Sequence, residues 1–217
     1  MATIRVLKIT LAITLLMVSR AWAQSSPQPS PANASGTVQS SCEAFAPQDA
    51  GQSQGATLVS VRITTEGKMR DPILYQSSGD STLDKAALAC ANGYHIGYLS
   101  VGGRPAEVRW VLAHNWAARG VGFGPAIPPG AQNKACKSNA RPDVIPNPTT
   151  TVSYRIATDG TVTGAAVAQS SGVPSLDQDV VECVSAWRFF PVTQNGQPVE
   201  AGQQLQVNWG GPTTQGT

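Results

Sequence analysis

The amino-acid sequence predicts an α+β fold of two repeated modules, each a β-hairpin, one helix and a final edge strand in a small antiparallel sheet. Three observations predict this fold. Residues 57–116 align with residues 150–209 without a gap, and a repeat of this length has the size of a small domain. In each copy, apolar residues first alternate with polar ones and later recur at helical spacing. We call these stretches the N-terminal repeat and the C-terminal repeat.

Each copy begins with a predicted hairpin. Val59, Val61 and Ile63 alternate with polar residues, which indicates a strand with one buried face, and the C-terminal repeat shows the same alternation. Gly67 and Gly160 each follow an acidic residue and predict the tight turn, because glycine accepts a positive φ. A second strand follows each turn.

A helix is predicted after the second strand, beyond the Gln-Ser-Ser-Gly segments at 76–79 and 169–172. Its apolar positions are spaced three and four residues apart, which places them on one stripe. The stripe consists of Leu83, Ala87, Cys90, Ala91 and Tyr94 in the first copy, and of Leu176, Val180, Cys183, Val184 and Trp187 in the second.

Four polar residues at the start of the helix can be explained by helix capping and the helix dipole, without a catalytic role. Thr82 and Ser175 stand where a side chain caps the helix. Asp84 and Asp177 fall in the first turn, where a negative charge is favourable to the helix dipole. The serine pairs Ser77-Ser78 and Ser170-Ser171 precede the helix in both copies, so a turn-and-cap role is favoured over that of a hydrolase nucleophile. For the two aspartates, a dipole role is favoured over that of a general base.

The final strand follows a loop that contains Gly103 or Gly196. Its apolar positions are Leu112, His114 and Trp116 in the first copy, and Leu205, Val207 and Trp209 in the second. As the last element of the module, this strand is expected at an edge of its sheet. His114 is interpreted as a packed residue, and His95, the other histidine, as a surface or loop residue.

The four cysteines predict two disulfides, since they occur in a chain that begins with an export signal. Three pairings are possible in principle. Cys90 and Cys183 are equivalent in the repeat, while Cys42 and Cys136 each precede the first strand of a module, so the symmetric solution is Cys42–Cys90 and Cys136–Cys183. Zinc is the alternative, but no C-x-x-C pair occurs. We therefore expect structural bridges and no metal.

Residues 1–23 have the order of a cleavable secretory signal peptide. Arg5 and Lys8 precede an apolar stretch at 9–18, and Ala21-Trp22-Ala23 is a small-x-small cleavage signal. A retained membrane anchor is the alternative, but a helix over 9–18 covers roughly 15 Å at ~1.5 Å per residue, about half of a ~30 Å hydrocarbon core. Export with cleavage after Ala23 is the prediction.

The remaining chain divides by composition. Residues 24–41 read as a flexible linker, 42–116 as module 1, 117–134 as a Gly/Pro-rich linker, 135–209 as module 2 and 210–217 as a tail. Loss of the signal peptide removes three positive charges and no negative one from a net charge of +2. The mature protein then has no basic excess, which argues against nucleic acid as a partner.

Several motifs in fixed order resemble the TonB C-terminal domain family. In the C-terminal repeat they are Ile156-x-x-Asp159-Gly160-x-Val162, Ser170-Ser171-Gly172, Leu176-Asp177, Trp187-Arg188-Phe189-x-Pro191 and Asn195-Gly196-x-Pro198-Val199. The N-terminal repeat keeps Gly67, Ser77-Ser78-Gly79, Leu83-Asp84, Gly103 and Pro105. It reads Tyr94-His95-Ile96-Gly97-Tyr98 in place of the aromatic–arginine–aromatic–x–proline element.

The resemblance implies a periplasmic, non-enzymatic module that docks envelope proteins, in particular TonB-dependent outer-membrane transporters. Docking in that family occurs by strand addition: an extended peptide pairs with the exposed last strand. The residues expected to bind the partner are Arg109, Trp110, Val111 and Leu112 in the first copy, and Gln203, Gln204, Leu205, Gln206 and Val207 in the second. No cofactor and no small-molecule substrate are indicated.

Other interpretations stay open at this point. One alternative is a closed structural pseudo-dimer in which the edge strands of the two modules pair, and a dimer of whole chains is a further option. An inner-membrane energy transducer resembling TonB is disfavoured, because the linker at 24–41 reaches at most about 56 Å at ~3.1 Å per residue. A small secreted hydrolase would rest on isolated serines and two histidines.

Overall fold

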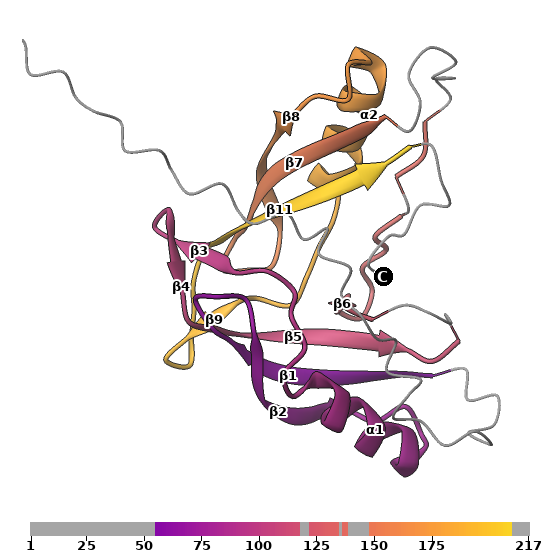
Figure 1. The fold of residues 1–217 in the computed structure, drawn as a ribbon, viewed down its shortest axis with the longest axis vertical. Helices are drawn as coiled ribbons and strands as arrows, with labels where there is room; N and C mark the ends of the chain where they lie inside the picture. Colours follow the sequence, from indigo (N-terminus) through magenta and orange to yellow (C-terminus); the bar gives the residue numbers. More distant parts are fainter. Residues whose placement is uncertain (1–54, 118–121, 135, 139–147, 210–217) are drawn as a thin grey trace, which may run out of the picture. The chain divides into compact units, whose positions relative to one another are not determined.

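The computed structural model describes residues 55–117, 122–134, 136–138 and 148–209. These residues form two antiparallel sheets and two helices (Figure 1), so the predicted α+β class is confirmed. The predicted signal peptide, the linker at 24–41 and the tail at 210–217 lie outside the described residues. Cys42 does too, so the Cys42–Cys90 bridge stays a prediction.

The N-terminal repeat folds in the order strand, strand, helix, short hairpin, strand. The elements are β1 (Ala56–Ile63), β2 (Met69–Gln76), α1 (Ser81–Ala91), β3 (Leu99–Val101), β4 (Arg104–Ala106) and β5 (Val108–Asn115). A further short strand, β6 (Phe123–Pro125), lies in the segment that the sequence predicts to be a linker.

The C-terminal repeat contains the same kinds of element in the same order. They are β7 (Thr149–Ile156), β8 (Val162–Gln169), α2 (Pro174–Ser185), β9 (Thr193–Gln194), β10 (Gln197–Pro198) and β11 (Ala201–Asn208). Gly67 and Gly160 have φ angles of 81° and 84°, as the predicted turns require.

Both helices start two residues earlier than the sequence suggests. The N-cap of α1 is Asp80, whose carboxylate accepts hydrogen bonds from the backbone N–H groups of Thr82 and Leu83. The residue before α2 is Val173, and Pro174 occupies the first helical position, where its fixed φ suits a helix. Thr82 and Ser175 lie inside the first turn, so the prediction that they cap the helices is wrong.

The two repeats exchange their short hairpins. One sheet has the strand order β10-β9-β5-β1-β2, with β6 also paired to β5, and the other has the order β4-β3-β11-β7-β8 (Figure 1). Strand β9 therefore joins the sheet of the N-terminal repeat, and β3 joins that of the C-terminal repeat. The sequence predicts two self-contained sheets and does not reveal this exchange.

The exchange uses equivalent contacts on both sides. Thr193 of β9 is the ladder partner of Arg109 on β5, and its hydroxyl donates a hydrogen bond of 3.3 Å to the Arg109 carbonyl. Ser100 of β3 is the ladder partner of Gly202 on β11, and its hydroxyl donates to the Gly202 carbonyl at 3.5 Å. The first residues of each last strand thus pair with the short hairpin of the other repeat.

The exchange corrects two expectations about the last strands. The sequence predicts both at an edge, but neither last strand lies at an edge of its sheet: β9 and β6 pair with β5 along the side that faces away from β1, and β11 lies between β7 and β3. Strands β5 and β11 belong to different sheets. The alternative in which the two last strands pair with each other is therefore wrong as well.

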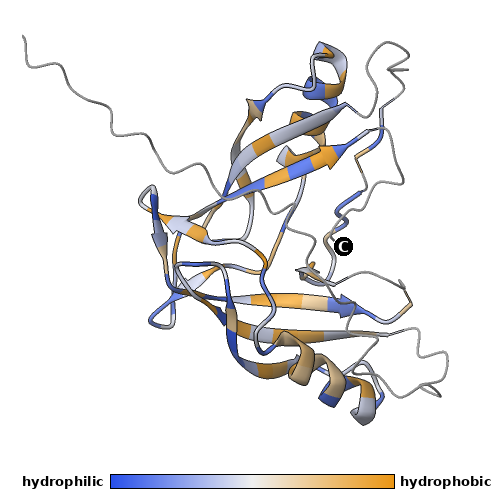
Figure 2. Ribbon diagram, viewed as in Figure 1, coloured by the Kyte–Doolittle hydropathy of each residue, from blue (hydrophilic) through white to orange (hydrophobic). Residues whose placement is uncertain are grey.

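The hydrophobic core draws on both repeats. The side chains with the least exposure include Trp110, Leu112 and Val59 from one repeat and Ile156 and Val180 from the other, and they belong to one contiguous cluster. Strand β5 shows orange, hydrophobic bands along its length in Figure 2. The predicted apolar stripe of α2 is confirmed at its Leu, Val and Val positions, which are all buried.

An aromatic segment after α2 links the repeats within this core. The ring of Phe189 lies 5.9 Å from that of Trp110 and 5.9 Å from that of Trp187, both in edge-on geometry. The indole N–H of Trp110 donates a hydrogen bond of 2.8 Å to the Phe190 carbonyl. The Phe190 ring in turn contacts Tyr75 at 5.2 Å. The core of the N-terminal repeat is thus completed by residues of the C-terminal one.

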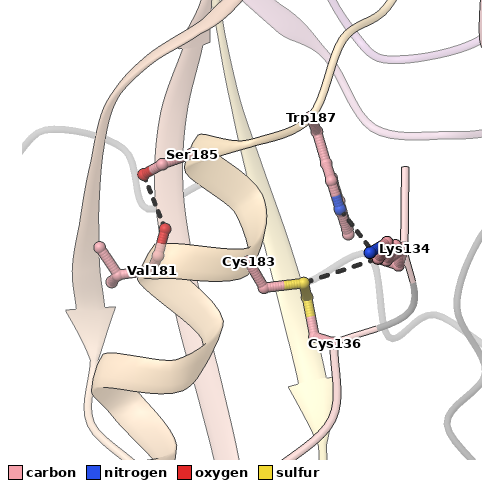
Figure 3. Close-up of a disulfide and its surroundings, with 6 residues drawn as sticks. All are labelled: Lys134, Cys136, Val181, Cys183, Ser185 and Trp187. Carbon is pink, nitrogen blue, oxygen red and sulfur yellow. Dashed lines mark hydrogen bonds between the residues drawn. A yellow bond between two sulfur atoms is a disulfide. The ribbon is translucent and has the colours of Figure 1, made fainter. Parts of the chain in front are cut away.

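The predicted Cys136–Cys183 disulfide is confirmed, with the two Cα atoms 5.5 Å apart (Figure 3). It joins α2 to the segment that precedes β7. The carbonyl oxygen of Lys134 lies 3.6 Å from the Cys183 sulfur and accepts a hydrogen bond of 3.0 Å from the Trp187 indole N–H. Lys134 and Cys136 are therefore both held against the end of α2.

Removal of this bridge should destabilise the protein. The double variant Cys136→Ser/Cys183→Ser is expected to lose about 2–4 kcal/mol of unfolding free energy, because the bridge restricts the unfolded chain over a sequence separation of 47. Urea unfolding of the variant and of the wild type under the same conditions measures the loss. Coincident unfolding midpoints would show that the bridge adds no stability.

Candidate docking site

The four predicted docking residues of β5 are largely committed to the fold. Trp110 and Leu112 are core residues, with 1% and 0% of their surface exposed. The Arg109 guanidinium donates a hydrogen bond of 3.1 Å to the Ser60 carbonyl on β1. Val111 is 9% exposed. A partner at β5 would therefore meet backbone groups more than side chains.

The outer side of β5, which faces away from β1, is itself paired. Strand β6 runs antiparallel to it, with Leu112 opposite Pro125 and His114 opposite Phe123. The Ala126 N–H donates a hydrogen bond of 3.1 Å to the Val111 carbonyl. The sequence shows β6 only as an aromatic residue within a Gly/Pro-rich segment, which is too short for a periodic signal.

The predicted docking residues of β11 are arranged differently. Val207 is 5% exposed, whereas Gln203, Gln204 and Leu205 are half-buried and Gln206 is exposed. All of them pair with β7, Gln203 opposite Tyr154 and Val207 opposite Thr150. The C-terminal strand therefore presents more side-chain surface than β5 does.

The backbone register shows which groups of β11 point outward. The Trp209 N–H donates to the Pro148 carbonyl at 2.9 Å, in register with the β7–β11 ladder. Because hydrogen-bonded pairs alternate in an antiparallel ladder, Gln203 and Leu205 bond β7, while Gly202 and Gln204 point away from it. Gly202 meets β3. The Gln204 N–H donates to the side-chain oxygen of Gln203 at 2.9 Å, an acceptor that an incoming strand can replace.

A buried carboxylate lies next to the end of β11. The Trp209 indole N–H donates to the Thr150 hydroxyl at 3.0 Å, and that hydroxyl donates to the Asp177 carboxylate at 2.7 Å. The Ser171 hydroxyl and backbone N–H donate to the same carboxylate at 2.8 and 2.9 Å, and the Ser170 hydroxyl is a further donor. This network joins β7, the end of β8, α2 and the end of β11.

The N-terminal repeat has the same network around Asp84. Its donors are the hydroxyls of Thr57, Ser77 and Ser78 and the backbone N–H of Ser78, while the Trp116 indole N–H donates to Thr57. The sequence interpretation of the aspartates as dipole partners misses this role. Its signal was present, since the threonine, both serines, the aspartate and the tryptophan are identical in the two repeats.

The surroundings of the two carboxylates also set their ionisation. Burial by itself would raise the pKa of Asp177 and of Asp84, but the hydroxyl and N–H donors outweigh it, so both pKa values lie below the ordinary range. A carboxylate that stays ionised and already accepts several hydrogen bonds is a poor general base. The network is therefore structural.

The two histidines lie apart from this network. His114 is 2% exposed, with its ring 4.3 Å from Trp116 and 5.5 Å from Phe123. His95 is exposed, and its Nε2 donates to the Glu66 carbonyl at 2.7 Å. The packed and surface roles predicted for them agree with these positions. The serine pairs donate to the aspartates, so the geometry gives the hydrolase interpretation no support.

Two further features of the described residues concern membranes and metal ions. None of the described helices combines the length and apolar character needed to cross a membrane. Within the same part of the chain, His, Cys, Asp and Glu side chains do not gather in groups of three or more that could hold a metal ion.

Comparison with known proteins identifies one family. Residues 148–210 match the family described as Gram-negative bacterial TonB protein C-terminal, a span that runs from the residue before β7 to the residue after Trp209. No curated protein and no solved structure matches the chain. Domains of this family are non-enzymatic interaction domains, periplasmic in Gram-negative bacteria, that interact with outer-membrane transporters and other envelope proteins. Residues 148–210 are thus similar to the TonB C-terminal domain family.

Proposed function

We propose that the chain is a periplasmic, non-enzymatic binding protein of two TonB C-terminal-like modules, residues 42–116 and 135–209. It takes up an extended segment of an envelope protein, such as the plug of a TonB-dependent transporter, by strand addition to the outer side of β11. The family match over β7 to β11 carries the proposal, because domains of this family interact with such proteins. Export through the signal at 1–23 brings the protein to that compartment.

The assignment of a second module to residues 42–116 draws on sequence and geometry together. The N-terminal repeat aligns without a gap with the part of the chain that the family match covers. Its strands and helix follow the same order, and its carboxylate network has the same donors around Asp84 as the C-terminal network has around Asp177.

Among the strands that the structure describes, the outer side of β11 is less covered than that of β5 and is therefore the better docking side. Among the described strands, the partner of β11 on that side is β3, at the single pair Gly202–Ser100. The Gln204 N–H points outward, and its acceptor is a side-chain oxygen that rotates away readily. An incoming strand would replace this bond with a backbone bond and would contact the half-buried Gln203 and Leu205. Strand β5 is covered by β6 and β9.

Two substitutions at one position test the proposal. Gln204→Pro removes the outward N–H but leaves the bonds of β11 to β7, because those come from the neighbouring residues. Gln204→Ala is the matched control, since it removes the side chain and keeps the N–H. We expect Gln204→Pro to weaken binding of a synthetic transporter-plug peptide by about tenfold or more relative to Gln204→Ala.

Calorimetric titration with the plug peptide gives the two affinities, and thermal unfolding confirms that both variants are folded. Equal affinities for the proline and alanine variants would rule out strand addition at this side of β11. If the wild-type protein bound no plug peptide, the proposal that a TonB-dependent transporter is its partner would be wrong.

A further inference from the structure

Strand β6 occupies the side of β5 on which a strand-addition ligand would lie. It runs antiparallel, pairs Leu112, Ala113 and His114 with residues 125, 124 and 123, and continues to the bond between the Ala126 N–H and the Val111 carbonyl. It comes from the segment between the repeats and not from the sheet's own hairpins. Its position is that of an added strand.

The side chains of this segment are buried as those of a bound peptide would be. Phe123 is 7% exposed, and its ring lies 5.5 Å from the ring of Tyr94 and 5.5 Å from that of His114. Ala126 is fully buried in a second small cluster with Leu58 and Val111. The segment is therefore anchored by an aromatic residue at one end and a small apolar residue at the other.

Pro125 fits a strand that is paired on one side only. The hydrogen bond from Ala126 to Val111 fixes the register, so the nitrogen of Pro125 points away from β5. Proline lacks an N–H group and is tolerated where that group would face away from the ladder. The same residue prevents a further strand from extending the sheet at this point.

We propose that the outer side of β5 is a second strand-addition site, and that residues 123–126 are its tethered ligand. The site accepts an extended peptide of the pattern aromatic–Gly–Pro–small, running antiparallel to β5. The covalent tether keeps β6 at an effective concentration on the order of millimolar, so it holds the site closed against dilute external peptides. This inference concerns β5 alone and goes beyond the proposed docking at β11.

The test compares an opened site with the closed one. The double variant Phe123→Ser/Ala126→Ser removes both apolar anchors and keeps the length of the segment. Ile127→Ser is the matched control, because Ile127 is 38% exposed and lies just outside the paired residues. The probe is the synthetic peptide of residues 122–128, Gly-Phe-Gly-Pro-Ala-Ile-Pro, and a peptide with serine in place of its phenylalanine is the negative control.

We expect the probe to bind the double variant at least about tenfold more tightly than it binds the wild type or Ile127→Ser, because the tethered competitor is gone. Hydrogen exchange at the amides of Val111 and Ala113 should be slow in the wild type, fast in the double variant and slow again with the probe. Equal affinity for all three proteins, or no binding by a folded double variant, overturns the proposal.

If the double variant does not fold, the wild type provides the test. Probe at about 10 mM, above the effective concentration of the tether, should displace β6 and accelerate exchange of the Ala126 amide. Unchanged exchange under these conditions overturns the proposal. The Gln204 variants at β11 leave this result unaffected, so failure of the proposed function and failure of this inference are distinguishable.

Discussion

Replacing Gly160 by alanine is expected to lower the unfolding free energy by about 3–5 kcal/mol. Gly160 has a φ of 84°, which disfavours any residue with a Cβ atom. A Cβ at this position would also lie 1.9 Å from the carbonyl oxygen of Phe189, a backbone atom that cannot rotate away. The segment that carries Phe189 into the shared core would have to move.

Gly196→Ala separates the two causes. Gly196 has a φ of 78°, but a Cβ there would meet nothing within 4 Å. Its substitution should cost only the backbone strain, about 1–2 kcal/mol. Urea unfolding of both variants gives the difference that the close approach to Phe189 contributes. If Gly160→Ala lost no more stability than Gly196→Ala, the described approach of Phe189 to the turn would be wrong.

Asp177→Asn is expected to destabilise the protein by about 3–5 kcal/mol. The carboxylate accepts hydrogen bonds from the hydroxyls of Thr150, Ser170 and Ser171 and from the Ser171 N–H. Asparagine has one acceptor oxygen, and its NH₂ group would face hydroxyl donors. Asp159→Asn is the control, because that carboxylate is exposed and its bonds to Thr161 are local. A similar loss in both variants would contradict the network.

The same network sets a pH dependence. The folded-state pKa of Asp177 is lowered, so its stabilising effect is fully present above the unfolded-state pKa of about 3.9 and is lost as the pH falls toward the folded-state value. The stability difference between the wild type and Asp177→Asn should therefore be constant near neutral pH and shrink below about pH 4. A difference that grows on acidification would contradict the direction of the shift.

The sequence predicts the local elements because their signals are local. Alternation around Val59 and Val61 gives β1, the glycines at 67 and 160 give the turns, and the stripe through Leu176 and Val180 gives α2. The gap-free repeat predicts the Cys136–Cys183 bridge, because in the symmetric pairing each helix cysteine bonds the cysteine that precedes the first strand of its own module. These features depend on neighbours within one repeat, which a single sequence displays directly.

The exchange of hairpins could not be predicted in the same way. Strands β3 and β9 are only two or three residues long, too short for a period of two to indicate a partner. Their destination depends on contacts between distant residues, such as Thr193 with Arg109. The aromatic element around Phe189 is present in one repeat only, and its contact with Trp110 became visible only in three dimensions.

The polar network was missed for a different reason. Asp84 and Asp177 satisfy the rule for negative charge in a first helical turn, and that sufficient explanation concealed the second role. Five identical polar or aromatic positions shared by both repeats were the available signal. A fully satisfied buried network helps to specify a unique core, so hydrogen-bonding side chains shared by both repeats are consistent with such a network.

Amide hydrogen exchange, followed residue by residue as a transporter-plug peptide is added, tests the docking account most directly. Strand addition at β11 predicts that the Gln204 amide becomes protected at saturation, while the amides of Val111 and Ala113, already covered by β6, do not change. Protection gained on β5 with no change at Gln204 would contradict the account.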